Sequence, residues 1–234
     1  MKKTPTEEKF SLFYDKWVCQ LEEYLTFLVQ DYTHHQYDHS HYQNLIAKIT
    51  THHKNYYRVK WAAAHDDVCA FFTPVWLTPL ENAYLWVTGW KPSAVFRFVD
   101  TLRKTGTGLV DLTEEQVKKI ESLRVKIKME EEKVEREMER QQVGLADRRM
   151  VELVKLARCV GGRGTLSSEE GTPTTIVGGE VVALLSGLER MMKMGDCVRL
   201  KTLKGLLDMM NPKQCVELLA AQSMFHVQLR RSDR

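Results

Sequence analysis

The sequence of 234 residues predicts an all-α fold, with about seven or eight helices in a single domain over residues 7–230. Apolar residues recur with the helical period along several long segments, whereas no segment alternates in the way that a half-buried strand does. In addition, residues 78–81 and 113–116 have the Thr-x-x-Glu or Thr-x-x-Gln form of a capping box, which starts a helix.

The first predicted helix covers residues 7–30. Its apolar residues share one broad face: Phe10, Phe13, Tyr14, Trp17, Leu21, Tyr24, Leu25 and Leu28. Glu7 and Glu8 suit its N-terminal end, where the helix dipole favours acidic side chains. This face can pack into the core of the chain. Its aromatic rings also suit a docking surface, because aromatic anchors dominate the energetics of interfaces.

A polar connection is expected over residues 31–42, and a second helix at about residues 43–72. The connection contains His34, His35, His39 and His41. A solvated loop is the favoured interpretation, because no cysteine accompanies these histidines and Asp38 is the only carboxylate close to them. A metal site and a pH-responsive cluster are the alternatives. The inner face of the second helix is expected to carry Leu45, Ile49, His52, Tyr56, Val59 and Ala63.

Residues 74–102 are the segment around which we expect the chain to be organised, and they contain three of the five tryptophans. Thr78 is expected to cap a helix that ends near Gly89. The apolar stripe of this helix would be Leu80, Ala83, Tyr84 and Val87. Ser93 is expected to cap a second helix, with Val95, Phe96, Val99 and Leu102 on its inner face. We interpret this pair as a structural nucleus without chemistry of its own.

A long central helix is predicted to begin after Thr113. Its outer face is dense in mixed charge, which is typical of a solvated helix surface, and a short coiled-coil contact is the alternative. Residues 159–179 are rich in Gly, Ser and Thr and nearly lack large apolar residues. They predict a flexible insertion within the helical domain.

The helical pattern resumes at Glu180 and stops near Gly195. Asp196 is a residue type that caps helices well, so we expect it to start a further helix. Asn211 and Pro212 then suit the beginning of the last helix.

The composition excludes several classes of protein. No apolar run approaches the roughly 20 residues that cross a membrane, and the N-terminal residues lack the apolar core of a secretory signal, so no membrane partner is expected. The net charge of +3 is too close to balance to indicate nucleic acid by itself. The five cysteines are widely spaced and form no Cys-x-x-Cys pair, which favours reduced thiols in a cytosolic or nuclear protein.

The patterns that mark catalytic sites are missing. The sequence has no Gly-x-Ser-x-Gly, no His-Glu-x-x-His and no phosphate-binding loop. A cysteine nucleophile paired with one of the eight histidines is the enzymatic alternative that the residue types leave open. Because no basic stripe with interleaved aromatic residues is present either, we predict a non-enzymatic binding protein without a metal site.

Three blocks, taken together, resemble one plant family. They are FYDKWVCQLEEYLTFL near the N-terminus, PVWLTPLENAYLWVTGWKPS in the middle and VRLKTLKGLLDMMNPKQCVELLAA near the C-terminus. In this order and spacing they are similar to the Delay of Germination family. The same domain forms the C-terminal half of the TGA-type basic-leucine-zipper transcription factors. The resemblance covers residues 10–229.

The resemblance implies a regulator of seed dormancy, of abscisic-acid signalling and of transcription, located in the nucleus and in part in the cytoplasm. It implies a type 2C protein phosphatase or a transcription regulator as the partner. The segment that contacts the phosphatase in the family is a short aromatic and acidic motif on the first helix. This motif matches Phe13, Tyr14, Asp15 and Trp17, with Lys16 between them. Tyr14 and Trp17 would be buried anchors, and Asp15 would lie at the rim.

The resemblance also raises two alternatives. Family members bind haem through a His-x-x-x-His pair after the last helical hairpin; His226 matches the first histidine, whereas Arg230 stands at the second position. No cofactor is the main expectation, and haem or another small ligand at His226 is the first alternative. The second alternative is sequence-specific DNA binding, as in the TGA factors. The basic region and zipper of those factors have no match here.

Overall fold

The computed structural model describes residues 3–34, 39–106, 108–145 and 173–231, and within these ranges the predicted all-α class is confirmed. The helices are α1 (Pro5–His34), α2 (His39–Asp66), α3 (Cys69–Phe72), α4 (Pro79–Ala83), α5 (Ala94–Thr105), α6 (Glu114–Leu145), α8 (Pro173–Met209) and α9 (Pro212–Arg231). Eight helices therefore lie in the described ranges, as expected. The β-type pairing found there is a single bridge between Trp86 and Gly89.

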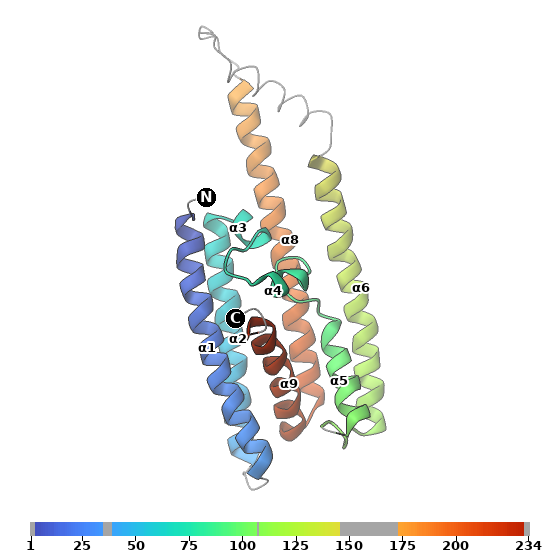
Figure 1. Ribbon diagram of the computed structural model, residues 1–234. Helices are drawn as coiled ribbons and strands as arrows, with labels where there is room; N and C mark the ends of the chain where they lie inside the picture. The colour runs from blue at the N-terminus through green and yellow to red at the C-terminus, as the bar shows by residue number, and fades with distance from the viewer. Residues whose placement is uncertain (1–2, 35–38, 107, 146–172, 232–234) are drawn as a thin grey trace.

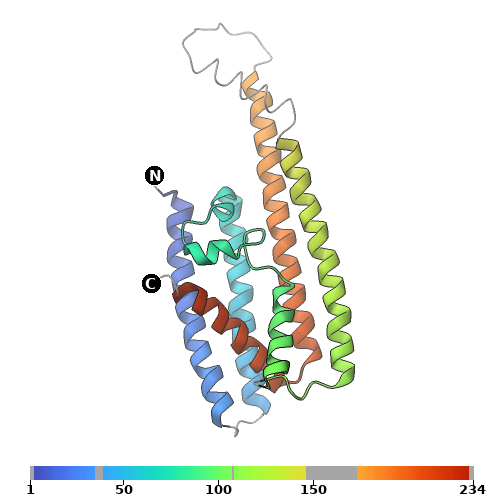
Figure 2. The same ribbon diagram turned by 45° about the vertical axis from the view of Figure 1, so that its right-hand side comes forward.

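The long helices lie in two pairs, and the last helix crosses between them. α1 packs on α2, and α6 packs on α8 along most of its length (Figure 1). α9 runs obliquely from the end of α8 to the first half of α1, and contacts α1, α2 and α5 (Figure 2). The α6 and α8 pair extends well beyond the other helices at one end. None of the helices in the described ranges combines the length and apolar character of a membrane span.

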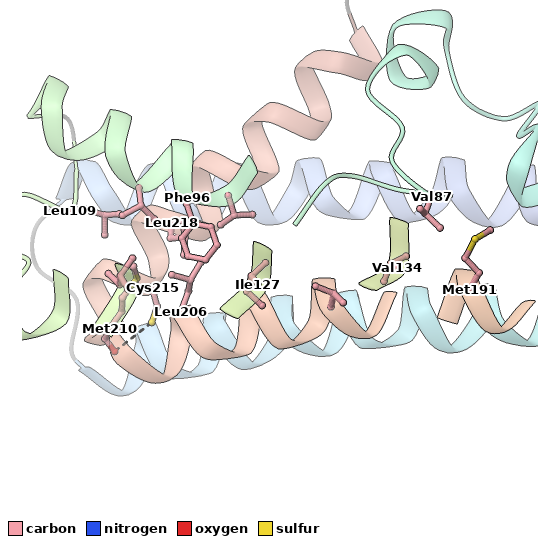
Figure 3. Packing of buried hydrophobic residues seen from close by; sticks show 14 residues of the cluster. Val87, Phe96, Leu109, Ile127, Val134, Met191, Leu206, Met210, Cys215 and Leu218 are labelled. Atoms are coloured by element: carbon pink, nitrogen blue, oxygen red, sulfur yellow. Dashed lines mark hydrogen bonds between the residues drawn. The ribbon is translucent and has the colours of Figure 1, made fainter. Parts of the chain in front are cut away.

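The largest group of buried apolar residues lies between α5, α6, α8 and α9 (Figure 3). Phe96 of α5, Ile127 of α6, Leu206 of α8 and Leu218 of α9 meet there, each with at most 2% of its surface exposed. Burying a side chain of this size contributes about 1.5–3 kcal/mol. This group therefore holds the second pair of helices to α9. A second buried group, around Phe10, joins α1 to α2 and to residues 68–76.

The polar connection predicted over residues 31–42 is wrong in its extent. α1 continues to His34 and α2 begins at His39, while residues 35–38 lie outside the described part of the chain. At this end, Leu28 and Leu45 are buried, and Tyr42 packs against them. Packing between α1 and α2 therefore stabilises helical structure in residues that their polar composition alone would assign to a loop.

The second helix is shorter than predicted. α2 ends at Asp66, and α3 is a separate turn of helix. The side chain of Asp67 accepts a hydrogen bond from the backbone N–H of Ala70 at 3.2 Å, so the chain turns between the two helices. The turn places Phe71 in the buried group around Phe10.

The capping box at Thr78 is confirmed, but the helix that it starts is short. The Thr78 hydroxyl accepts from the Glu81 N–H, and the Glu81 carboxylate accepts from the Thr78 N–H. α4 nevertheless ends at Ala83, and the predicted apolar stripe is wrong, because Ala83 and Tyr84 are exposed whereas Glu81 is buried. The helix cannot continue to Gly89, since Val87 has a positive φ of 43°.

The second helix of this segment begins where it was predicted, but the predicted cap by the Ser93 side chain does not form. Ser93 precedes α5, but its side chain makes no capping bond. Its backbone N–H instead donates to the Glu131 carboxylate of α6 at 2.6 Å. Val95, Phe96 and Val99 are buried as expected.

The helix starts predicted at Thr113 and Asn211 are confirmed. Thr113 and Gln116 form reciprocal side-chain and backbone hydrogen bonds of 2.9 and 3.2 Å at the start of α6. Asn211 and Gln214 do the same at the start of α9, with 3.0 and 2.9 Å. Both helix starts are encoded by residues that are close in the sequence, and the tertiary structure retains them.

The helix start predicted at Asp196 is wrong. α8 is continuous from Pro173 to Met209, so Asp196 lies inside a helix, where it is fully buried. Because α8 continues through this position, the backbone N–H groups of the next turn are already bonded within the helix. The Asp196 carboxylate instead accepts hydrogen bonds from side chains of other residues. Residues 173–179 belong to α8 and not to the predicted insertion, and residues 159–172 lie outside the described part of the chain.

Candidate functional site

A cavity of about 170 Å³ lies between α1, α2, the segment 74–94 and α9, with α8 at its floor. Residues that the sequence analysis named at opposite ends of the chain meet here, because Tyr14, Trp17 and His226 all line it. Aromatic side chains form much of the wall: Tyr14, Trp17, Tyr56, Tyr57, Phe71, Trp76, Tyr84, Trp90 and Phe225. The fold thus uses its aromatic residues to enclose a space.

The floor of the cavity is a buried ion network centred on Asp196. One carboxylate oxygen accepts from Lys60 Nζ at 2.9 Å and from Arg199 Nη1 at 2.6 Å, and the other accepts from Trp61 Nε1 at 2.9 Å. All three charged side chains are almost fully buried. Burial lowers the pKa of Lys60 to about 8, although Asp196 opposes this by stabilising the charged form.

The network also sets the shape of the segment that closes the cavity. The Arg199 guanidinium donates to the carbonyl oxygens of Trp86, Val87 and Trp90, the last two at 2.8 and 2.7 Å. Lys60 donates to the Thr88 carbonyl at 3.0 Å. Buried cations from α2 and α8 therefore satisfy the carbonyl groups of a segment that has no helix or sheet of its own.

The geometry of this segment explains its glycine. Val87 and Thr88 have φ angles of 43° and 59°, a conformation that is costly for these side chains and persists only when the surroundings impose it. Gly89 lies directly against Arg199: a Cβ at this position would be 2.8 Å from Arg199 Cζ. The close approach of backbone and guanidinium therefore requires a residue without a side chain.

Glu81 joins the first helix, the capping box and the last helix beside the cavity. Its carboxylate accepts from the Tyr14 hydroxyl at 2.9 Å, from the Thr78 N–H at 2.7 Å and from Arg230 Nη1 at 3.0 Å. Arg230 also donates to the Trp76 carbonyl at 2.6 Å. Three segments that are far apart in the sequence are held at this one carboxylate.

The structure separates the predicted partner-binding residues into two sets. Tyr14 and Trp17 are 8% and 7% exposed, and both pack into the buried group around Phe10. Asp15 is 55% exposed at its side chain and pairs with Arg230 Nη2 at 2.5 Å. Phe13 is half-buried. Phe13 packs at the edge of the same buried group, so Asp15 faces outward, whereas the three aromatic residues support α1 from inside.

Burial keeps the histidines and the buried tyrosines of the cavity wall neutral, whereas Glu81 in the same wall forms an ion pair with Arg230. Burial, with smaller contributions from His226 and His52, lowers the pKa of His53 to about 3. Burial also lowers the pKa of His226, whose Nδ1 lies 2.9 Å from the Gln222 carbonyl oxygen. Since a carbonyl only accepts, Nδ1 carries the proton and Nε2 carries the lone pair. The pKa of Tyr56 is raised by burial and by the negative charge of Asp196.

The residues beside His226 do not fit a haem. The cavity measures about 170 Å³, below the roughly 300–1,000 Å³ of pockets for drug-sized ligands, and a haem is larger than most of these. Arg230, at the position of the second expected ligand, is committed to Glu81, Asp15 and Trp76. A guanidinium also has no lone pair for iron. The space beside His226 is therefore too small for a haem.

Sequence reasoning missed the ion network of Lys60, Asp196 and Arg199. A signal was present: Asp196 and Arg199 lie three residues apart on the same helix face as Met192 and Leu203, both of which are buried. Charged residues on an apolar stripe predict a buried pair. The described residues contain no group of three or more His, Cys, Asp or Glu side chains that could hold a metal ion.

Comparison with known protein families gives one match. The model of the family described as DOG1, seed dormancy control, matches residues 25–101. This range includes α2, α3, α4, most of α5 and the segment that closes the cavity.

Similar proteins come from plants. Protein DOG1-like 4 of Arabidopsis thaliana is 55% identical over 225 residues, which are 96% of this chain and 92% of that protein. Protein RESPONSE TO ABA AND SALT 1 of the same plant is 28% identical over 241 residues, or 100% of this chain and 99% of that protein. Transcription factor TGA5, also of Arabidopsis thaliana, is 27% identical over 80% of this chain and 52% of that protein.

Proposed function

This chain belongs to the seed dormancy control (DOG1) family, and from this membership we propose that it is a non-enzymatic regulator that acts by binding another protein. The family resemblance seen in the three sequence blocks is confirmed. The proposed setting is seed dormancy and the response to abscisic acid, which the names of the similar proteins support. The proposed partner is a type 2C protein phosphatase or a transcription regulator, and the proposed location is the nucleus.

The observation that carries this proposal is an outward stripe on the first half of α1. Leu12, Asp15, Lys16 and Cys19 are spaced so that they share one helix face, and all four are exposed. Leu12 is 67% exposed, more than Phe27 and Val29 on the same helix. An apolar residue beside charged residues is a typical composition for a contact surface.

The buried residues of the motif have a supporting role in this proposal. Trp17 stacks on His52 of α2, with ring centroids 5.1 Å apart and planes 2° apart. Tyr14 is fixed by its hydrogen bond to Glu81. These contacts hold α1 in one orientation, so that the outward stripe is presented to a partner as a rigid surface.

A role in transcription is supported by the similarity to TGA5, and direct DNA binding is the weaker alternative. A groove between α6 and α8 contains four cations, Lys133, Arg190, Lys193 and Lys201. Each of them forms an ion pair with a nearby glutamate. Cations that are already paired contribute little to phosphate binding. We therefore propose that contact with DNA passes through a protein partner.

The test is a binding assay with purified type 2C phosphatases and with nuclear extracts. The double variant Leu12→Ala/Asp15→Ala removes the outward stripe and leaves the core intact. We expect partner binding to weaken by about tenfold or more, as when an interface anchor is truncated. The matched control is Met129→Ala/Glu132→Ala on the exposed face of α6, which has the same spacing of an apolar and an acidic residue.

The outcome is decided by comparing the two double variants, both of which should remain folded. Equal retention of every captured partner by both variants would exclude the α1 stripe as the binding surface. Tyr14→Phe serves as a third arm, because it removes only the hydroxyl that binds Glu81. It should reduce binding less than the stripe variant does.

A further inference from the structure

One wall of the cavity contains a polar atom without a partner. His53 is 6% exposed, and its Nε2 has no hydrogen bond to any described residue. A buried donor or acceptor that is left unsatisfied costs about 1–3 kcal/mol. His53 lines this cavity and also a groove between α2, α8 and α9, and a molecule inside the cavity can supply the missing partner.

The size of the cavity limits what this molecule can be. A cavity of about 150 Å³ in another protein holds a benzene molecule, and this one measures about 170 Å³. One six-membered ring with a small substituent therefore fills it. The surrounding rings of Tyr14, Trp17, Tyr56 and Trp76 can meet such a ring edge-on or in offset stacking, which aromatic pairs prefer.

The charges around the cavity limit its chemistry further. The charged side chains that line the cavity are three cations and two anions, an excess of one positive charge, so a cationic ligand is disfavoured: Lys60, Lys91 and Arg199 against Glu81 and Asp196. A carboxylate would need several donors in the cavity, but the three N–H groups of Lys60 already bind the Thr88 carbonyl, the Thr88 hydroxyl and Asp196. A neutral ligand avoids both costs.

We propose that this cavity binds a compact neutral aromatic molecule of one ring that carries a hydroxyl group, a ligand of the phenol class. A hydroxyl both donates and accepts, so it satisfies His53 in either tautomer. Tyr56 and His226 also line the cavity and offer a second hydrogen bond. The proposal concerns the inside of the fold and does not depend on partner binding by the outward stripe of α1.

The ligand has a route from solvent. Tyr84 and Lys91 line the cavity and are both exposed, so they mark its mouth between the segment 84–91 and α9. Phe225 packs edge-on against Tyr84, with ring centroids 6.1 Å apart. These two rings lie at the entrance, where a small rotation of Tyr84 changes access.

In the experiment the full chain is titrated with four probes, and binding is measured by calorimetry and by tryptophan fluorescence. Phenol is the test ligand. Toluene has the ring without the hydroxyl, n-hexanol has the hydroxyl without the ring, and benzoate has the ring with a charge. We expect saturable binding of phenol, with toluene and n-hexanol each about tenfold weaker and no binding of benzoate.

The variants locate the site. His53→Leu should weaken phenol about tenfold and leave toluene unchanged, whereas the same substitution at the exposed His65 should change neither. Tyr56→Phe is the second variant, for use if His53→Leu does not fold, because it removes only one oxygen atom. It should weaken phenol binding by a smaller factor than His53→Leu does.

Absence of saturable phenol binding to the unmodified chain would overturn the proposal. Tighter binding of benzoate than of phenol, or equal binding of n-hexanol, would also overturn it, because each would show a different ligand class. None of these results bears on capture of a protein by α1, which is measured separately.

Discussion

Arg230 donates a hydrogen bond to Glu81 at 3.0 Å and thereby ties the last helix to the capping box of α4. The same guanidinium binds the Trp76 carbonyl and the Asp15 carboxylate, and lies 5.3 Å from the ring centre of Tyr14. The resemblance to the family led to the expectation of a second haem-linked histidine at this position. Arg230 is instead a structural link between α9, α4 and α1.

Arg230→Ala should lower the free energy of unfolding by about 2–4 kcal/mol. The substitution removes a largely buried ion pair and leaves the Trp76 carbonyl without its donor. Urea denaturation measures the loss. Arg231→Ala is the matched control, because Arg231 is exposed and pairs with Glu22 on the surface, so its loss should be below about 1 kcal/mol. Similar losses for both variants would contradict the structural role of Arg230.

Asp196→Asn distinguishes a buried ion network from a helix cap. Asparagine caps helices as well as aspartate does, so a capping role predicts almost no change. In the observed network the substitution leaves the buried cations Lys60 and Arg199 without a carboxylate. We expect a loss of about 3–5 kcal/mol in the free energy of unfolding. Asp208→Asn, an exposed position of the same helix, should cost less than about 1 kcal/mol.

The residues that were predicted well are those whose structure is decided locally. The capping boxes predicted at Thr78 and Thr113 and the helix start predicted at Asn211 depend on neighbouring residues, and all three form. The aromatic face of α1 was also visible from its helical spacing. The same spacing was compatible with a core face and with a docking surface, and the sequence could not decide between them.

The features that could not be predicted are decided by distant residues. The segment 86–90 turns away from helical geometry because Arg199, more than 100 positions later, binds its carbonyl groups. Asp196 was assigned to a helix start because its residue type favours one, and only burial against Lys60 shows its role. Sequence patterns of one segment contain no information about a charge that arrives from another helix.

Gly89→Ala should destabilise the fold by about 1–3 kcal/mol, because the added methyl group would contact a guanidinium that several hydrogen bonds hold in place. Thermal or urea unfolding measures the effect. The control is Gly144→Ala in α6, where no atom of the described residues lies within 4 Å of the added carbon. It should stabilise by about 0.4–1 kcal/mol. A neutral effect at Gly89 would show that Arg199 can move aside.

Stability should decrease as the pH falls from 6.5 to 5. The pKa of His53 is about 3 in the folded chain and 6.5 ordinarily, so between these values only the unfolded chain binds this proton. The free energy of unfolding is then unaffected above pH 6.5 and falls by about 2 kcal/mol by pH 5. His226 and His52 shift in the same direction. His53→Gln should reduce the slope of the free energy of unfolding against pH in this range. An unchanged slope would show that another group binds the proton on unfolding.

Haem should not bind at His226 in this chain. The space beside the histidine is small, and Arg230 stands where the resemblance led us to expect a second ligand. Titration with haemin should therefore give the same Soret band for the unmodified protein and for His226→Ala, with His65→Ala as a control for surface histidines. Arg230→His restores the family spacing but loses the bonds to Glu81 and Trp76, so we expect it to destabilise the fold more than it favours iron. A Soret shift that requires His226 in the unmodified protein would show that the cavity opens far more than its walls indicate. It would also make His226 an axial ligand and remove the size argument on which the phenol-class proposal depends.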